Sequence, residues 1–367
     1  MPSELHKEIN AQRSHAENAF SIELETIKLE DKRPKPNTWN LSPWGVLLYI
    51  AGGKTASGFQ VTPKYIGDHK LIEMAIATIL SDRALLLMGV PGTAKSWLSE
   101  HLSAAISGQS NLLIQGTSGT SEDNLRYGWN YAHLISKGHS LEALVKSPVL
   151  RAMETGKIVR IEELTRIPTE VQDALISILS EKTIPIPELN HEYQAINGFN
   201  LIATANDQDK GIYPISAALQ RRFNTLYMPL PHRLEDEIRI VKQRVDQLGQ
   251  SLSLPLDQLQ DNHLHHLLTI FRELRNGITS DGKQKLKSTK SSWSPAETIS
   301  MVHHARIQHH FFSQQAFGPG DLVNAMFNNF IKVDEDERNC IQEYNESVLK
   351  KRQDFKEWYE SIKKISK

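Results

Sequence analysis

One short run of this chain combines two glycines, a lysine and a serine at a spacing that suits the binding of a phosphate. The run is Gly89-Val90-Pro91-Gly92-Thr93-Ala94-Lys95-Ser96. Its glycines allow positive φ, so that several backbone N–H groups can point at one anion. Lys95 could then reach the β- and γ-phosphates of a nucleotide, and the Ser96 hydroxyl could hold Mg²⁺. The alternative, an ordinary turn between a strand and a helix, leaves the lysine and serine in register unexplained.

Carboxylates and an amide further along the chain could complete this chemistry. Residues Lys157–Ile161 have the β-branched, apolar character of a strand, and Glu162 and Glu163 follow them. At the carboxyl end of a parallel strand, Glu163 could polarise an attacking water and Glu162 could orient the magnesium shell. Asn206 ends another apolar run and could hydrogen-bond the γ-phosphate or the water. The plain alternatives are exposed acids at an edge strand and a routine turn asparagine.

A pair of arginines ends a short helical pattern. Arg221 and Arg222 follow Ala217-Ala218-Leu219-Gln220. An arginine at a subunit edge could reach the γ-phosphate held by a neighbouring subunit and stabilise the charge of the transition state. The simpler alternative is favourable positive charge at a helix C-terminus.

An α/β pattern surrounds these residues. Apolar runs alternate with helical patterns over residues 41–231, which predicts a parallel sheet with helices on both faces. Residues 183–196 predict a hairpin, which Pro185 and Pro187 place outside the centre of the sheet. The predicted strands are Ala84–Met88, Asn111–Gln115, Lys157–Ile161, Phe199–Ala205 and Thr225–Pro229, and the predicted helices are His69–Ser81, Ser96–Ile106 and Thr169–Ser180.

The parts on either side of this pattern differ in character. Residues 1–40 are charged and contain prolines, which predicts an N-terminal arm and linker. Residues 232–334 predict a helical lid, and residues 335–367 a C-terminal tail that an amphipathic packing helix explains better than a nucleic-acid or membrane segment. Residues 277–292 predict a loop or small hairpin. The helical patterns of the lid are Arg233–Leu248, Leu259–Arg275, Pro295–Phe312 and Gly320–Ile331.

Composition narrows the class of protein. The 42 basic and 43 acidic residues nearly cancel, so overall charge gives no argument for a nucleic-acid or membrane partner. The single cysteine, Cys340, cannot form an internal disulfide, as expected in a reducing compartment. The N-terminus is polar and no apolar run approaches the ~20 residues needed to span a bilayer. We therefore expect a cytoplasmic protein.

In their order and spacing, these motifs resemble the AAA+ ATPases, and within them the MoxR-type group, over about residues 60–330. The phosphate loop is similar to the GxPGxAK[ST] form common in that group, in which alanine precedes the lysine. The other similar motifs are Tyr65-Ile66-Gly67 for the adenine pocket, Glu162-Glu163-Leu164-Thr165-Arg166-Ile167-Pro168 for the acidic strand end, Thr204-Ala205-Asn206 for the first sensor and Arg222-Phe223 for the arginine finger.

The resemblance implies an AAA+ P-loop core with a parallel sheet and a helical lid, and ATP hydrolysis that depends on Mg²⁺. It implies assembly into a ring, as a hexamer, and chaperone-like remodelling of a protein client alongside a partner with a von Willebrand A domain. Two alternatives stay open: a nucleotide-gated scaffold with weak hydrolysis, and a DNA- or RNA-directed NTPase. The expected catalytic residues are Lys95, Glu163, Asn206, Arg221 and Arg222, the expected metal ligands are Ser96 and Glu162, and the expected nucleotide contacts are residues 65–67 and 89–96 with Trp97.

Four positions depart from the family pattern. Glu162 replaces the usual aspartate, and Thr165 replaces the usual asparagine. Arg160 lies in a strand that is normally apolar and needs a partner, which we expect to be an acid on a neighbouring helix. Ala296 stands where the family has its sensor-2 arginine, so the resemblance predicts either slower turnover or a role supplied by the next subunit.

Overall fold

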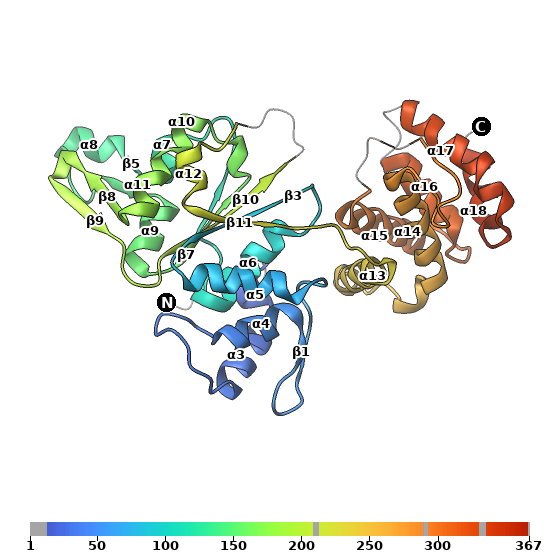
Figure 1. Cartoon of the computed structure of the whole chain (residues 1–367), viewed down its shortest axis with the longest axis horizontal. Helices are drawn as coiled ribbons and strands as arrows, with labels where there is room; N and C mark the ends of the chain where they lie inside the picture. The colour runs from blue at the N-terminus through green and yellow to red at the C-terminus, as the bar shows by residue number, and fades with distance from the viewer. Residues whose placement is uncertain (1–12, 208–212, 288, 290–292, 330–334, 366–367) are drawn as a thin grey trace. The chain divides into compact units, whose positions relative to one another are not determined.

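The chain divides into two compact units (Figure 1). The computed structural model describes residues 13–207, 213–287, 289, 293–329 and 335–365. Residues up to Met228, apart from the loop residues 91–93, belong to the first unit, and residues from Pro229 onward belong to the second.

The first unit is built on a five-stranded parallel sheet with the strand order β11-β3-β10-β7-β4. Two of its three interior strands, β7 and β10, are buried along their whole length, as expected where helices cover both faces of a parallel sheet. The predicted α/β fold and all five predicted strands are confirmed. The strands are β3 (Ala84–Gly89), β4 (Leu113–Gln115), β7 (Ile158–Glu162), β10 (Asn200–Asn206) and β11 (Phe223–Tyr227).

Helices pack on this sheet, and the helix that follows the glycine loop is central to the site. It is α6 (Lys95–Ser107), which begins after Ala94 and ends at Gly108, where φ is +70°. The single predicted helix over Thr169–Ser180 is instead two short helices joined at Asp173, whose own angles stay near helical values. The other helices of this part are α5 (His69–Leu80), α7 (Glu122–Leu125), α9 (Pro148–Thr155), α10 (Thr169–Gln172), α11 (Ala174–Ser180) and α12 (Ala217–Gln220).

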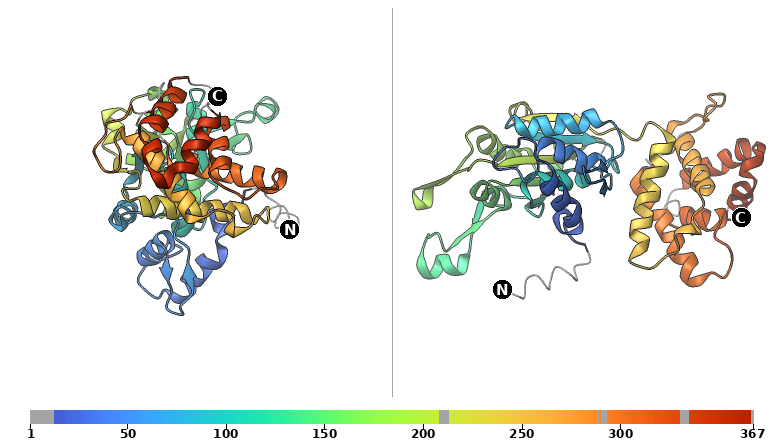
Figure 2. Two further views of the ribbon diagram at one scale, coloured as in Figure 1. Left: turned by 90° about the vertical axis from the view of Figure 1, so that its right-hand side faces the viewer. Right: turned by 90° about the horizontal axis from the view of Figure 1, so that it is seen from below.

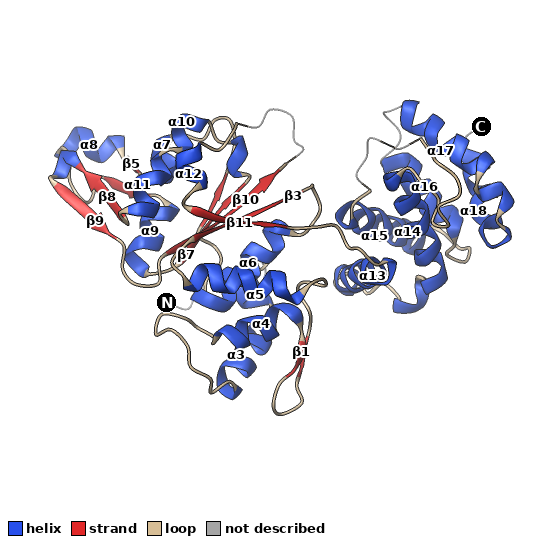
Figure 3. Cartoon of the chain, viewed as in Figure 1, coloured by secondary structure: helices blue, strands red, loops and turns tan. Residues whose placement is uncertain are grey.

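Three antiparallel strand pairs of the described residues lie outside the main sheet (Figure 3). One of them is β1 (Gly53–Lys54) with β2 (Gln60–Val61). Another pairs β8 (Thr183–Ile186) with β9 (His191–Gln194), which confirms the hairpin predicted there and its place away from the sheet's centre. The third pairs β5 (Tyr127–Trp129) with β6 (Leu144–Lys146), and α8 (Tyr131–Lys137) lies between them in the chain.

The described part of the N-terminal segment packs into the first unit rather than forming a separate arm. Leu24, Ile27 and Leu41 are buried in the same apolar cluster as side chains of α5, α6 and β3. Arg13 bonds Glu100 of α6 at 2.7 Å. The elements of this segment are α2 (Ala16–Ala19), α3 (Ser21–Glu30), α4 (Pro43–Ala51), β1 (Gly53–Lys54) and β2 (Gln60–Val61).

Replacing Ile27 by alanine should lower the free energy of unfolding by about 2–5 kcal/mol, because it removes a side chain from a packed core. Ile27 is 1% exposed, whereas Ile22 on the same helix is 72% exposed. Ile22→Ala is therefore the matched control and should change stability by less than ~0.5 kcal/mol. Urea denaturation measures both, and equal effects would mean that α3 does not pack here in solution.

The second unit is helical (Figure 2), and its described helices share one apolar core. The C-terminal residues belong to this core, since Ile341, Trp358 and Ile362 are fully buried in it. Residues 277–292 contain an isolated antiparallel bridge, Ile278 to Lys285, and part of the range lies outside the described residues. The helices are α13 (Leu234–Gln250), α14 (Asp261–Asn276), α15 (Pro295–Phe312), α16 (Pro319–Asn329), α17 (Glu335–Ser347) and α18 (Lys356–Ile365). Within the part of the chain that is described, no helix combines the length and apolar character that crossing a bilayer requires.

Candidate functional site

The loop between β3 and α6 has the backbone of a phosphate cradle. Gly92 has a φ of +80°, and Ala94 has a φ of +64°, in the left-handed region where an alanine costs about 1–2 kcal/mol. The Lys95 ammonium donates to the carbonyl oxygens of Gly89 and Val90, each at 2.8 Å. The lysine side chain therefore folds back over the loop, and its charge lies beside the backbone that would surround a phosphate.

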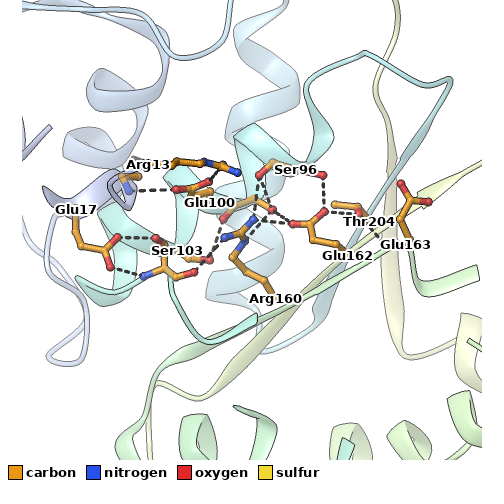
Figure 4. Close-up of polar contacts among 12 residues, drawn as sticks. Arg13, Glu17, Ser96, Glu100, Ser103, Arg160, Glu162, Glu163 and Thr204 are labelled. Carbon is orange, nitrogen blue, oxygen red and sulfur yellow. Dashed lines mark hydrogen bonds and ion pairs between the residues drawn. The ribbon is translucent and has the colours of Figure 1, made fainter. Parts of the chain in front are cut away.

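The Glu162 carboxylate lies among four donors (Figure 4). Its Oε2 accepts hydrogen bonds from the hydroxyls of Ser96 and Thr204, both at 2.6 Å. Its Oε1 accepts from the Ser99 hydroxyl at 2.6 Å and from the Arg160 guanidinium at 2.8 Å. Burial alone would raise the pKa of Glu162, but the guanidinium and the three hydroxyls outweigh it, so this pKa lies below its usual range.

The same geometry fits a magnesium ion. The Ser96 hydroxyl and Glu162 Oε2 lie side by side where α6 begins and β7 ends, and both are hard oxygen donors of the kind that Mg²⁺ prefers. The longer side chain of glutamate thus does not prevent its carboxylate from reaching the loop serine.

Glu163 and Asn206 lie together at the carboxyl edge of the sheet. The Asn206 amide nitrogen is 2.9 Å from both carboxylate oxygens of Glu163. Asn206 itself is paired in register with Gly89, the first residue of the loop. The backbone of Glu163 has a φ of +57°, and its N–H donates to the Thr204 hydroxyl at 3.1 Å. The structure therefore brings the acid and amide predicted from sequence next to the start of the loop.

The Tyr65-Ile66-Gly67 segment is tied to α6 through Trp97. The indole N–H of Trp97 donates to the carbonyl oxygen of Lys64 at 2.9 Å. Lys64 is buried and bonds Glu23 of α3, and its ammonium lies 4.3 Å from the centre of the Phe20 ring. Burial lowers the pKa of this lysine. Helix α3 thus helps to hold the residue just before Tyr65, a role that the charged composition of residues 1–40 did not indicate.

The two arginines at the end of α12 have different surroundings. Arg222 donates to the Ser180 hydroxyl at 2.6 Å and to the Ala218 carbonyl at 2.5 Å. Arg221 is exposed, and among the residues that the structure describes its guanidinium has no hydrogen-bond or ion-pair partner. Of the pair, Arg221 is the one whose side chain can extend away from its own unit.

The prediction that Arg160 pairs with an acid on a neighbouring helix was wrong. The acid is Glu162, two residues further along the same strand, and not a residue of a neighbouring helix. Alternate residues of a strand share one face, so Arg160 and Glu162 both point toward α6. Sequence reasoning also missed Ser99 and Thr204 as partners of the carboxylate. The spacing of Ser99 from Ser96, nearly one helical turn, was the available signal.

The chain is similar to several known proteins. A family model described as the AAA domain (dynein-related subfamily) matches residues 84–223. YehL of Escherichia coli (strain K12) is 36% identical over 338 residues, which is 91% of this chain and 92% of YehL. A Staphylococcus epidermidis (strain ATCC 12228 / FDA PCI 1200) protein is 28% identical over 157 residues, which cover 42% of this chain and 59% of the length of that protein. A solved structure of a Thermotoga maritima RuvB mutant has a TM-score of 0.47 and 15% identity, with 78% of this chain and 79% of that chain covered. This chain belongs to the family of YehL, and within it residues 84–223 form an AAA domain with the AAA+ P-loop fold.

Proposed function

We propose that this chain is an ATP-hydrolysing AAA+ motor of the MoxR type that assembles into a hexameric ring and remodels a protein client. The observation that carries the proposal is the joining of a phosphate loop to two acids with different surroundings. Glu162 bonds the loop serine, whereas Glu163 is held by Asn206 beside the start of the loop. One acid is thus placed to help hold a metal ion and the other to act on water.

Each residue then has a role in phosphoryl transfer to water. The loop N–H groups and the first turn of α6 bind the phosphates, and Lys95 balances the charge on the β- and γ-phosphates. Ser96 and Glu162 would hold Mg²⁺, which supplies positive charge to the phosphate oxygens. Glu163 orients and polarises the attacking water, and Asn206 positions Glu163 and the γ-phosphate. Tyr65, Ile66, Gly67 and Trp97 flank the base.

The ring and the client rest on the family resemblance and on two structural features. The exposed Arg221 would meet the nucleotide of the next subunit. The antiparallel pairs β5–β6 and β8–β9 lie outside the main sheet, and we take them as counterparts of the two inserts that the MoxR resemblance implies within residues 117–150 and at residues 183–196. A protein partner with a von Willebrand A domain, a cytoplasmic location and slow turnover through Ala296 belong to the same proposal.

Steady-state phosphate release with Mg²⁺ and ATP, together with particle mass measured with and without ATP, tests this function. We expect release that saturates with ATP and a ring mass with nucleotide bound. Assembly with ATP but no release would favour the scaffold instead. Release that rises with added DNA or RNA, with salt-dependent binding, would favour the nucleic-acid-directed NTPase.

Replacing Lys95 by alanine should weaken ATP binding by about 2 kcal/mol, or ~30-fold, because a charge-assisted contact to phosphate is lost. Fluorescent-nucleotide titration measures the affinity. Lys157→Ala is the control, since that ammonium also donates to a backbone carbonyl, of Ser107 at 2.6 Å, at the opposite end of α6. Equal affinities for the two variants would rule out the assigned role of Lys95.

A further inference from the structure

Arg160 is a buried cation in the middle of the parallel sheet. Its side chain is 5% exposed, and β7 is paired with β10 on one side and β4 on the other. The guanidinium uses each of its nitrogens. Nε donates to the Ser99 hydroxyl at 3.0 Å, Nη1 donates to the Ser110 carbonyl at 3.0 Å, and Nη2 donates to Glu162 Oε1 at 2.8 Å. Such a planar fork, fixed at three points, holds its acceptors at defined positions.

The two carboxylate oxygens of Glu162 consequently have different partners. Oε1 is occupied by Arg160 and Ser99, and Oε2 faces Ser96 and Thr204. An aspartate at this position would be shorter by one C–C bond, ~1.5 Å, and could not reach both sets of donors. The arginine and the longer acid therefore depend on one another.

We propose that Arg160 is a positioning residue of the nucleotide site, which holds the Glu162 carboxylate so that Oε2 meets the magnesium ion beside Ser96. The inference rests on the proposed function, because it needs a magnesium nucleotide at this site. Arg160 itself touches neither nucleotide nor metal. It acts as the outer partner of a carboxylate near the metal, the kind of partner whose loss weakens metal binding.

The support for Arg160 extends to the N-terminal segment. The carbonyl oxygen of Ser110 accepts from Arg160, while the Ser110 N–H and hydroxyl donate to Glu17 at 3.0 and 2.5 Å. Glu17 belongs to α2, and the neighbouring pair Arg13–Glu100 attaches the same segment to α6 (Figure 4). A continuous series of polar contacts therefore runs from α2 to the acid beside the loop.

Replacing Arg160 by methionine should raise the Mg²⁺ concentration at half-saturation of the nucleotide complex about tenfold. Nucleotide affinity in EDTA should stay at the wild-type value, because the loop and Lys95 are intact. A Mg²⁺ titration with a fluorescent nucleotide gives the midpoint, and Mn²⁺ bound to the complex, measured by electron paramagnetic resonance, checks it without turnover. Arg160→Lys keeps the charge without the fork of nitrogens. Its Mg²⁺ midpoint should lie between those of wild type and Arg160→Met.

Lys157→Met is the matched control, because it removes a cation that links the start of the same strand to the C-terminal end of α6 at the Ser107 carbonyl, away from the loop. It should leave the Mg²⁺ midpoint unchanged. Ser99→Ala keeps both charges and removes the hydroxyl that bonds Oε1, so it should raise the midpoint about threefold. It tests the inference even where Arg160→Met folds poorly.

A double-mutant cycle tests whether the effects of Arg160 and Glu162 on the Mg²⁺ midpoint depend on each other. Glu162→Asp alone leaves Arg160 buried without its carboxylate, whereas Arg160→Val with Glu162→Asp restores an apolar strand followed by the shorter acid. The double variant should have a midpoint nearer to wild type than either single variant.

Unchanged midpoints in Arg160→Met and Ser99→Ala, with stability lost as in Lys157→Met, would show a purely structural pair and overturn the inference alone. A wild-type protein that binds no nucleotide, with or without Mg²⁺, would overturn the proposed function and the inference with it.

Discussion

Glu163→Gln should lower steady-state phosphate release about 10³-fold, because it removes the group that polarises the attacking water. Glutamine keeps the length of the side chain, and its carbonyl oxygen can still accept from the Asn206 amide, which bonds both Glu163 oxygens at 2.9 Å. ATP affinity should therefore stay near the wild-type value. Phosphate release and fluorescent-nucleotide binding, measured on the same preparation, separate the two effects.

Glu170→Gln is the control for this change, since Glu170 is an exposed acid in the first turn of α10. It should release phosphate at the wild-type rate. Equally slow release by wild type and Glu163→Gln would remove the motor proposal and leave the nucleotide-gated scaffold.

Arg221→Ala should reduce phosphate release by about 10³-fold, the effect expected for an arginine that stabilises transition-state charge across a subunit boundary. Its guanidinium has no partner among the described residues, so its loss should leave the stability of the subunit nearly unchanged. Arg222→Ala removes the bonds to Ser180 and Ala218 and should lower stability by about 1–2 kcal/mol. Phosphate release and thermal unfolding, measured for both variants, distinguish the two arginines.

Mixed assemblies test whether Arg221 acts on a neighbour. Arg221→Ala subunits keep Glu163, and Glu163→Gln subunits keep Arg221, so some interfaces in a mixture hold both groups. Random mixing at equal amounts should restore about a quarter of the wild-type rate if each interface works independently. No recovery in a mixture whose subunits exchange would mean that Arg221 does not act across the interface.

The sequence was most informative where a local pattern decides the structure. The strand Ala84–Gly89 is a short apolar run, and the glycines after it mark the turn that a phosphate requires. Glu163 and Asn206 were found because parallel strands end at one edge of the sheet, so residues far apart in the chain meet there.

Contacts that depend on side-chain direction were beyond the sequence. The sequence around Arg160 and Glu162 does not indicate that both carboxylate oxygens of Glu162 accept hydrogen bonds, because the donors Ser99 and Thr204 come from other elements. The packing of the N-terminal segment could not be predicted for a related reason. Its charged residues and prolines indicated an arm and a linker. In the structure, Glu17, Glu23 and Arg13 each bond a residue of the first unit, and Leu24 and Ile27, which follow them in the chain, are buried.

The docking of that segment also constrains the order in which the protein can fold. Arg13 meets Glu100 across 87 residues, and Glu17 meets Ser110 across 93. During synthesis at about 5–20 residues per second, α2 and α3 leave the ribosome roughly 5–20 s before α6 and the Ser110 loop are complete. Leu24 and Ile27 can meet the side chains of α4 early, but the part of their apolar cluster that α6 and β3 supply is completed only after that interval.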